Sequence, residues 1–304
     1  MSILLTGSTG NVGSALLQRL LKHGDEVTVF SRVPIDSDQY SVIVGDLTKE
    51  NSLISDISGI TMIIHCAGNV SFKHAGESNT LMMKSIIGCA QSLDVPVIYV
   101  STAFLYRGRD IFIPRNSYEQ DKYNAERMLI ESGIQYKIIR PSVIVGRRES
   151  GEIKNFSGMY RIIQVLEKIL KDNQGVVRFP MLSGTSNIVS VDDVVEAICI
   201  IKERKLFDTE IEYVVNNSPP SAHDVLQKIL VYLDAKEAIK SLDISFDMYE
   251  ALEDLSSSEY ALVEIGKHMK DYWALDYLFP KTDLVPVSPI SLEPLLKYYS
   301  NNRS

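Results

Sequence analysis

A glycine-rich turn near the start of the chain decides the fold: residues 4–13 read LLTGSTGNVG. An apolar run precedes the turn, and apolar residues at helical spacing follow it, so the stretch predicts a strand that leads into a helix. Gly7 permits the sharp turn, Gly10 lets the backbone approach a phosphate, and Gly13 allows close packing of helix on strand. An ordinary strand-to-helix turn is the alternative. We expect a dinucleotide pyrophosphate at this helix N-terminus, bound by Gly7, Thr9, Gly10, Asn11, Val12 and Gly13.

Strand-like and helix-like segments alternate through the first two thirds of the chain. This alternation predicts an α/β fold, a doubly wound parallel sheet of the Rossmann type with helices on both faces. The expected strands are Ser2–Leu5, Glu26–Phe30, Ser41–Val44, Thr61–His65, Val97–Ser101 and Tyr136–Arg140. The helices expected between them are Val12–His23, Thr80–Leu93 and Tyr118–Ser132.

The pattern changes after about Gly146, where glycine, serine and charged residues mix and the later segments are mostly helical. We expect residues 1–146 plus about 191–216 to form the dinucleotide-binding domain. A smaller, mostly helical lobe that binds the substrate is expected from about 147–190 plus 217–304.

Composition excludes several classes of protein. The chain has 304 residues, with 31 Lys and Arg against 39 Asp and Glu, a net charge of −8, which disfavours binding to nucleic acid. Cys66, Cys89 and Cys199 are odd in number and lie in apolar stretches, so we expect buried, reduced thiols and no metal site. There is no signal-like start and no apolar run of transmembrane length, so a soluble, cytoplasmic protein is expected.

The end of the second expected strand indicates which dinucleotide binds. Ser31 and Arg32 close that strand, and no acid follows before Asp36, whereas an acid at this point would bond the ribose 2′-hydroxyl of NAD. A guanidinium instead suits a 2′-phosphate, which favours NADP(H) over NAD(H), although Arg32 as a plain surface residue is the alternative. Asp46, followed by Leu47, is expected either to bond the adenine amino group or to cap a helix.

A tyrosine and a lysine are spaced for acid–base chemistry. Tyr118 and Lys122 stand one turn apart on a predicted helix, and an ammonium beside a phenol lowers the pKa of the phenol. Ser101 and Thr102 lie at the carboxyl end of a predicted strand, where doubly wound sheets bind ligands. A hydroxyl there can bond a reacting carbonyl oxygen.

With these motifs the chain resembles the extended short-chain dehydrogenase/reductases over roughly residues 1–216. The matching pieces come in the family's order: residues 6–13, Gly45-Asp46-Leu47, His65-Cys66-Ala67-Gly68, Ser101-Thr102-Ala103, Tyr118-x-x-x-Lys122 and Arg140-Pro141-Ser142. The resemblance is strongest to the fatty acyl reductase and thioester reductase branch. Residues 65–72 resemble its H-x-A-A-x-V-x-F segment, and residues 118–126 its Y-x-x-S-K-x-x-x-E segment, with Asp121 in place of the serine. Residues 140–151 and 187–194 resemble its R-P-x-x-I-x-G…G and N-x-V-x-V-D-x-V segments.

The resemblance implies a role for each matched residue. Tyr118 would be the general acid, Lys122 would bind the nicotinamide ribose and tune Tyr118, and Thr102, with Ser101 as the alternative, would hold the substrate oxygen. Asn79 would help to hold a proton-relay water, or else act as a core-facing helix cap. His65 is expected to be structural. The remaining residues expected at the cofactor are Cys66, Ala67, Gly68, Pro141, Ser142 and Val143.

The resemblance also implies a reaction, the NADPH-dependent reduction of an acyl thioester on coenzyme A or on an acyl carrier protein to an aldehyde or alcohol. Residues 143–178 contain seven Lys and Arg against four Asp and Glu, which suits docking of an acidic carrier, and a solvated helix face is the alternative. Other activities of the same scaffold remain open: ketone reduction, hydroxysteroid-like alcohol oxidation and nucleotide-sugar epimerisation. A non-catalytic NADP(H)-sensing regulator is a further alternative. The resemblance leaves two states of assembly open, a homodimer through the helices that carry Asn79 and Tyr118, which is common among such proteins, and a monomer.

Overall fold

The computed structural model describes residues 1–49, 53, 57–71, 76–108, 110–172, 176–208, 210–273, 278–281 and 283–303. The chain forms two compact units. Unit 1 comprises Met1–Ser142, Val189–Val215 and Phe279–Val287. Unit 2 comprises Val143–Ile188, Asn216–Leu278 and Ser288–Ser304. Phe72, the last residue of the H-x-A-A-x-V-x-F resemblance, lies outside the described residues.

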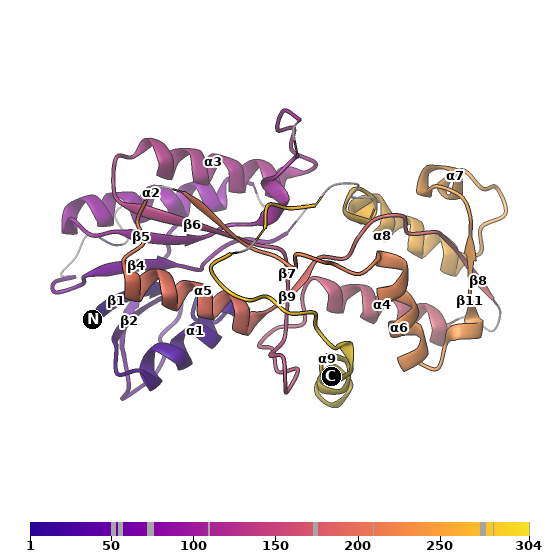
Figure 1. The fold of residues 1–304 in the computed structure, drawn as a ribbon, viewed down its shortest axis with the longest axis horizontal. Helices are drawn as coiled ribbons and strands as arrows, with labels where there is room; N and C mark the ends of the chain where they lie inside the picture. Colours follow the sequence, from indigo (N-terminus) through magenta and orange to yellow (C-terminus); the bar gives the residue numbers. More distant parts are fainter. Residues whose placement is uncertain are drawn as a thin grey trace. The chain divides into compact units, whose positions relative to one another are not determined.

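Unit 1 contains a seven-stranded parallel sheet in the order β10-β6-β5-β4-β1-β2-β3 (Figure 1). The central strands are buried along their whole length, because the sheet has helices on both faces. This confirms the predicted Rossmann-type class. The strands are β1 (Ser2–Thr6), β2 (Glu26–Ser31), β3 (Ser41–Val44), β4 (Met62–His65), β5 (Val97–Val100), β6 (Tyr136–Pro141) and β10 (Ile211–Val214).

Two pairs of helices cover the sheet. Helices α1 (Asn11–Lys22) and α5 (Val191–Arg204) pack together on one face, and α2 (Ser78–Leu93) and α3 (Ser117–Glu131) on the other (Figure 1). The Asn116 side chain caps α3, and a capping box formed by Ser190 and Asp193 starts α5. A short 3-10 helix, η1 (Ala103–Leu105), follows β5. The starts of α3 and η1 therefore place Tyr118 and Thr102 at the carboxyl end of the sheet.

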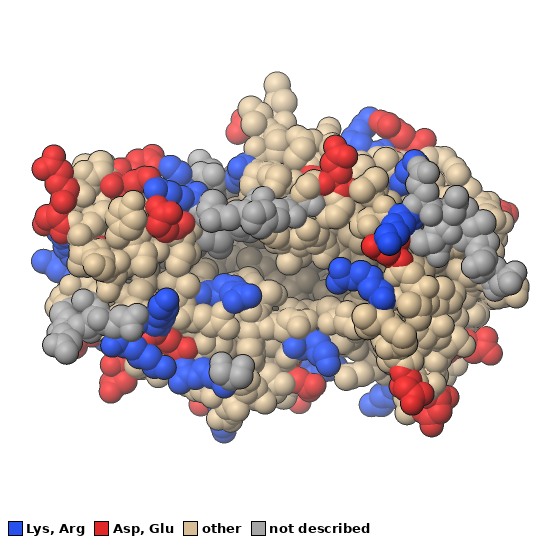
Figure 2. Space-filling model, turned by 180° about the vertical axis from the view of Figure 1, so that it is seen from behind, with Lys and Arg blue, Asp and Glu red and all other residues tan. Residues whose placement is uncertain are grey.

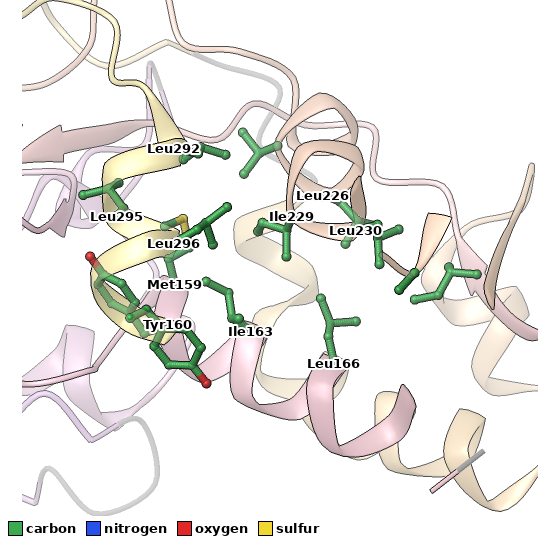
Figure 3. Packing of buried hydrophobic residues seen from close by; sticks show 14 of the residues in the cluster. Met159, Tyr160, Ile163, Leu166, Leu226, Ile229, Leu230, Leu292, Leu295 and Leu296 are labelled. Atoms are coloured by element: carbon green, nitrogen blue, oxygen red, sulfur yellow. The ribbon is translucent and has the colours of Figure 1, made fainter. Parts of the chain in front are cut away.

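Unit 2 has its own apolar core (Figure 3). Residues at helical spacing on α4 (Met159–Asp172), α6 (Ala222–Tyr232) and α9 (Leu292–Asn302) point toward one another in it. Strands β8 (Val177–Pro180) and β11 (Ile239–Leu242) form a parallel pair, and β7 (Val143–Val145) pairs with β9 (Ile188–Ser190). The remaining elements are η2 (Lys236–Ala238), α7 (Phe246–Glu250) and α8 (Ser257–Trp273).

The two glycines of the R-P-x-x-I-x-G…G segment have a packing role in unit 2. A Cβ atom at Gly146 would lie 2.1 Å from the carbonyl oxygen of Gly151. A Cβ atom at Gly151, where φ is +73°, would lie 2.1 Å from the carbonyl oxygen of Pro294. Any side chain at either position would therefore displace backbone.

Two features differ from what the sequence predicts. Residues 279–287 belong to unit 1, whereas the sequence analysis assigns all of 217–304 to the substrate lobe. This segment packs on unit 1 through buried side chains: the Phe279 ring lies 5.6 Å from the ring of Phe104, and Val285 is buried as well. The three cysteines are free, but Cys66 is only partly buried rather than buried. Among the described residues, no helix is long and apolar enough to cross a membrane.

Candidate active site

The glycine turn joins β1 to α1 as predicted, and its three glycines differ in why they are needed. A Cβ atom at Gly7, where φ is +75°, would lie 2.5 Å from the Ala67 nitrogen, and one at Gly13 would lie 2.1 Å from the Gly7 oxygen. These two glycines are required by packing within the protein. Gly10 has an ordinary φ of −86°, and its Cβ would meet only the Gly7 oxygen, at 3.3 Å. The open side of Gly10 is thus space that none of the described residues fills.

The start of α1 suits an anion. Gly10 is its N-cap residue, no side chain caps it, and its first turn contains no acidic residue. A helix N-terminus of this kind attracts phosphate through its backbone N–H groups and its dipole. The open Gly10 and the uncapped helix therefore fit the dinucleotide that the sequence predicts.

The segment after β4 lies against the glycine turn. The Thr6 hydroxyl is 2.7 Å from Nδ1 of His65 and accepts a bond from the Ala67 nitrogen at 3.2 Å. His65 is buried and stacked on Tyr99, and burial together with the Lys122 charge lowers its pKa to about 3. His65 is therefore neutral and structural in this arrangement. Burial raises the pKa of the Cys66 thiol to about 12, so Cys66 carries no charge.

Arg32 and Asp46 follow neighbouring strands, β2 and β3. Arg32 is exposed directly after β2. The Asp46 carboxylate accepts bonds from the Thr48 nitrogen at 3.1 Å and the Thr48 hydroxyl at 2.8 Å, which lower the pKa of Asp46. Asp46 thus closes a turn over residues 47–49 rather than capping a helix, and its adenine contact stays a prediction. Leu47 is buried in the core of unit 1.

Tyr118 and Thr102 meet at the carboxyl end of the sheet. A side-chain hydrogen bond joins them, and both residues are buried. Burial raises the pKa of Tyr118 to about 12, outweighing that hydrogen bond, which lowers it. The Tyr118–Lys122 spacing predicts that the ammonium lowers this pKa, whereas the pKa of Tyr118 is raised in the arrangement seen. The phenol is protonated at neutral pH.

Lys122 points to β5 instead. Its Nζ donates to the Val100 carbonyl at 3.1 Å and lies 4.8 Å from the centre of the Tyr99 ring. Burial lowers the pKa of Lys122 to about 8, although the charges of Glu126 and Asp121 oppose this shift. Lys122 therefore changes charge within reach of physiological pH.

Two buried hydroxyls at the ends of adjacent strands have no hydrogen-bond partner within the described part of the chain. Ser101 Oγ follows β5 and Ser142 Oγ follows β6, and the Ser101 nitrogen donates to the Ile139 carbonyl at 2.8 Å. Buried polar groups are nearly always paired, so these hydroxyls fit a polar ligand at this sheet edge. Pro141 is buried beside Ser142, and Val143 begins unit 2.

The Asn79 side chain is fully engaged inside the protein. Its Oδ1 accepts from the Asn69 nitrogen at 2.9 Å, and its Nδ2 donates to the Asn69 oxygen at 3.0 Å and to Asp121 Oδ2 at 2.8 Å. These bonds support the structural alternative for this side chain. The proton-relay role stays a prediction.

Sequence reasoning gave no role to two carboxylates of α3. Asp121 caps the start of α2, and Glu126 forms a buried ion pair with Arg140. The sequence does contain one indication of a role for Glu126, because it lies four residues, about one helical turn, after Lys122 on the same helix face. The basic stretch is weaker than its composition suggests, since Arg178 pairs with Glu259 and Asp254 and Arg147 with Glu152.

The fold and the turn together define a protein of the Rossmann type. A sequence profile described as the NAD dependent epimerase/dehydratase family matches residues 3–215, more than half of the chain. The chain belongs to this family of extended short-chain dehydrogenase/reductases, enzymes that use nicotinamide cofactors.

Individual relatives are distant. The chain is 23% identical to UDP-glucose 4-epimerase of Vibrio cholerae over 262 residues, covering 77% of this chain and 76% of the epimerase. The terminal R domain of the myxalamid PKS-NRPS pathway is 18% identical with a TM-score of 0.76, covering 99% of this chain and 90% of that domain. A thiolation-reductase di-domain from an archaeal non-ribosomal peptide synthetase is 17% identical with a TM-score of 0.71, covering 99% and 75%. At these identities the two solved structures show a shared fold.

Proposed function

We propose that the protein is an NADPH-dependent reductase that converts an acyl thioester to an aldehyde or alcohol. The observation that carries the proposal is the arrangement of Tyr118, which is bonded to Thr102 and placed by α3 near the strand end that holds Ser101. Reduction of a carbonyl needs a proton donor at the oxygen, and the Tyr118 phenol with the neighbouring Thr102 hydroxyl places such donors at the carboxyl end of the sheet.

Different residues of the chain would bind the cofactor and act on the substrate. The N-terminus of α1 with Gly10 would hold the pyrophosphate, Arg32 the 2′-phosphate, and Lys122 the nicotinamide ribose. NADPH, when bound, supplies the hydride. Tyr118 gives its proton to the substrate carbonyl oxygen, and the Thr102 hydroxyl, with that of Ser101 as the alternative, donates a hydrogen bond to the same oxygen. Loss of the thiol from the tetrahedral adduct then leaves the aldehyde.

The choice of a thioester draws support from unit 2. The likeness to the myxalamid R domain covers 99% of this chain and so includes unit 2, whereas the family profile ends at residue 215. The di-domain, by its title, joins a reductase to a thiolation domain. A carrier-bound thioester is therefore our preferred substrate.

The charge pattern is compatible with a carrier as partner. On the face shown in Figure 2, Lys and Arg side chains lie among Asp and Glu side chains. On α4, however, Arg161, Lys168 and Lys171 are all exposed and recur at helical spacing. We place the docking of an acidic carrier at these three residues.

The decisive experiment combines NADPH with acyl thioesters of short and long chain, on coenzyme A and on a carrier protein. We expect NADPH oxidation with matching release of free thiol. Tyr118→Phe should keep cofactor affinity and lose about 100-fold or more in turnover. Tyr123→Phe, on the same helix and stacked on Phe112 with ring centres 4.4 Å apart, is the matched control and should keep activity.

Two results would contradict the proposal. Absence of thiol release with every acyl chain and carrier excludes thioester reduction. Interconversion of UDP-sugars without net consumption of cofactor would instead identify an epimerase.

A further inference from the structure

A single buried carboxylate connects the helix that carries Tyr118 and Lys122 to the start of α2. Asp121 Oδ2 accepts from the backbone nitrogen and Nδ2 of Asn79, both at 2.8 Å. Asp121 Oδ1 accepts from the Thr80 nitrogen at 3.0 Å and the Thr80 hydroxyl at 2.7 Å. The N-cap residue of α2, Glu77, makes no side-chain cap of its own. Asp121 therefore caps α2 from a neighbouring helix.

The same contacts continue to the segment beside the glycine turn. Asn79, held by Asp121, bonds both backbone groups of Asn69. The neighbouring Gly68 lies against Lys122, because a Cβ atom there would be 3.1 Å from Lys122 Nζ and 3.2 Å from Asn79 Oδ1. Since Lys122 follows Asp121 in sequence, the contacts form a closed ring, Asp121–Asn79–Asn69–Gly68–Lys122.

Lys122, a member of this ring of contacts, is surrounded by other titratable groups. The titratable groups that face Lys122 come from α3, β4 and the residue after β4, and β5: Asp121, Glu126, His65, Cys66 and Tyr99. Of these, Asp121 and Glu126 are the carboxylates. Glu126 is bound at two points by Arg140, whereas Asp121 has no ion pair among the described residues.

We propose that Asp121 is a positioning residue that, through Asn79 and the Asn69–Gly68 segment, fixes Lys122 against Gly68, and that its carboxylate adds to the negative charge that Glu126 places near Lys122. The proposal rests on the function assigned above to Lys122, the binding of the nicotinamide ribose. The serine of the resembled motif would supply a hydroxyl here, without a charge. Burial lowers the pKa of Lys122, and the nearby carboxylates raise it. Together they set the pH above which Lys122 loses its charge and the cofactor binds less tightly.

The test is the dissociation constant of NADPH, measured by fluorescence from pH 6 to pH 10. In the wild-type protein we expect binding to weaken above about pH 8, where Lys122 loses its proton. In Asp121→Asn the midpoint of this loss should move down by about one pH unit. Glu131→Gln removes an exposed charge from the same helix and should leave the midpoint unchanged.

Every outcome is informative. An unchanged midpoint in Asp121→Asn overturns the proposal, and so does a loss of affinity that is equal at every pH, which is what a purely structural role gives. Where Asp121→Asn does not fold, Asp121→Ser keeps an acceptor and should show the same shift. If the wild-type protein binds NADPH but reduces no thioester, the proposed reaction is contradicted. The pH dependence of NADPH binding can still be measured, so the role of Asp121 is tested separately.

Discussion

Glu126 and Arg140 form a buried two-point ion pair, with Nε–Oε1 at 3.0 Å and Nη2–Oε2 at 2.5 Å. Arg140 also donates to the Tyr213 hydroxyl at 2.7 Å, so the pair ties α3 to β6 and β10. Removing one partner leaves the other charge buried and uncompensated.

We expect Glu126→Ala to lower the free energy of unfolding by about 3–5 kcal/mol, measured by urea denaturation. Glu131→Ala on the same helix is the control. Glu131 pairs with Arg127 in the open, with 62% of its side chain exposed, and its loss should be barely measurable. Equal effects of the two variants would show that the buried pair has no special role.

Glu259 should make unit 2 sensitive to acid. The hydrogen bond from Arg178 lowers the pKa of Glu259 to about 2. Because this pKa is below the unfolded value, the stabilisation is complete above about pH 4.5 and is lost as pH falls through about 2. The stability difference between wild type and Glu259→Gln should therefore shrink over this range in acid denaturation. A difference that stays constant from pH 6 to pH 2 would contradict the pairing; Glu264→Gln, at an exposed site, is the control.

Arg32 should decide between the two nicotinamide cofactors. Arg32→Ser removes the guanidinium expected at the 2′-phosphate, so NADPH affinity should fall about 10-fold or more while NADH affinity is retained. Binding titrations with both cofactors measure this. Lys22→Ser, which removes an exposed cation at the end of α1, should change neither affinity. An equal loss of NADPH and NADH affinity would show that Arg32 does not bind the 2′-phosphate.

Gly10 should matter for binding and not for folding. Gly10→Ala is compatible with its φ of −86°, so the protein should fold but bind NADPH about 10-fold or more weakly, because the methyl group occupies the open side of the turn. Gly13→Ala should fail to fold, since its Cβ would meet the Gly7 oxygen.

The control is Gly88→Ala on α2, where a Cβ atom would meet nothing within 4 Å. It should bind normally and gain up to about 1 kcal/mol in stability. Wild-type affinity in Gly10→Ala would place the pyrophosphate elsewhere.

Sequence predicted the sheet well because each strand is an apolar run and the glycine turn marks where the first crossover begins. It also brought Tyr118, Thr102 and Ser101 to one edge, since carboxyl ends of parallel strands share that edge. The direction of a side chain was not predictable in the same way. The spacing of Tyr118 and Lys122 places both on one helix face, yet the ammonium turns to the Val100 carbonyl.

Long-range polar contacts were also beyond sequence reasoning. Asp121 and Asn79 are 42 residues apart, and Arg178 and Glu259 are 81 apart. No periodicity links such positions, because each partner is brought there by packing of its own helix or strand. The return of residues 279–287 to unit 1 involves the buried side chains of Phe279 and Val285, which stand in a proline-containing stretch with no helical or strand periodicity.

That return constrains how the protein can be dissected. The chain leaves unit 1 after Ser142, re-enters at Val189, leaves again after Val215, re-enters at Phe279 and finally leaves after Val287. Neither unit is one uninterrupted segment, so no single truncation yields either of them intact. A protease cut within residues 216–278 would leave two fragments that each contribute to both units, and these should separate only under denaturing conditions.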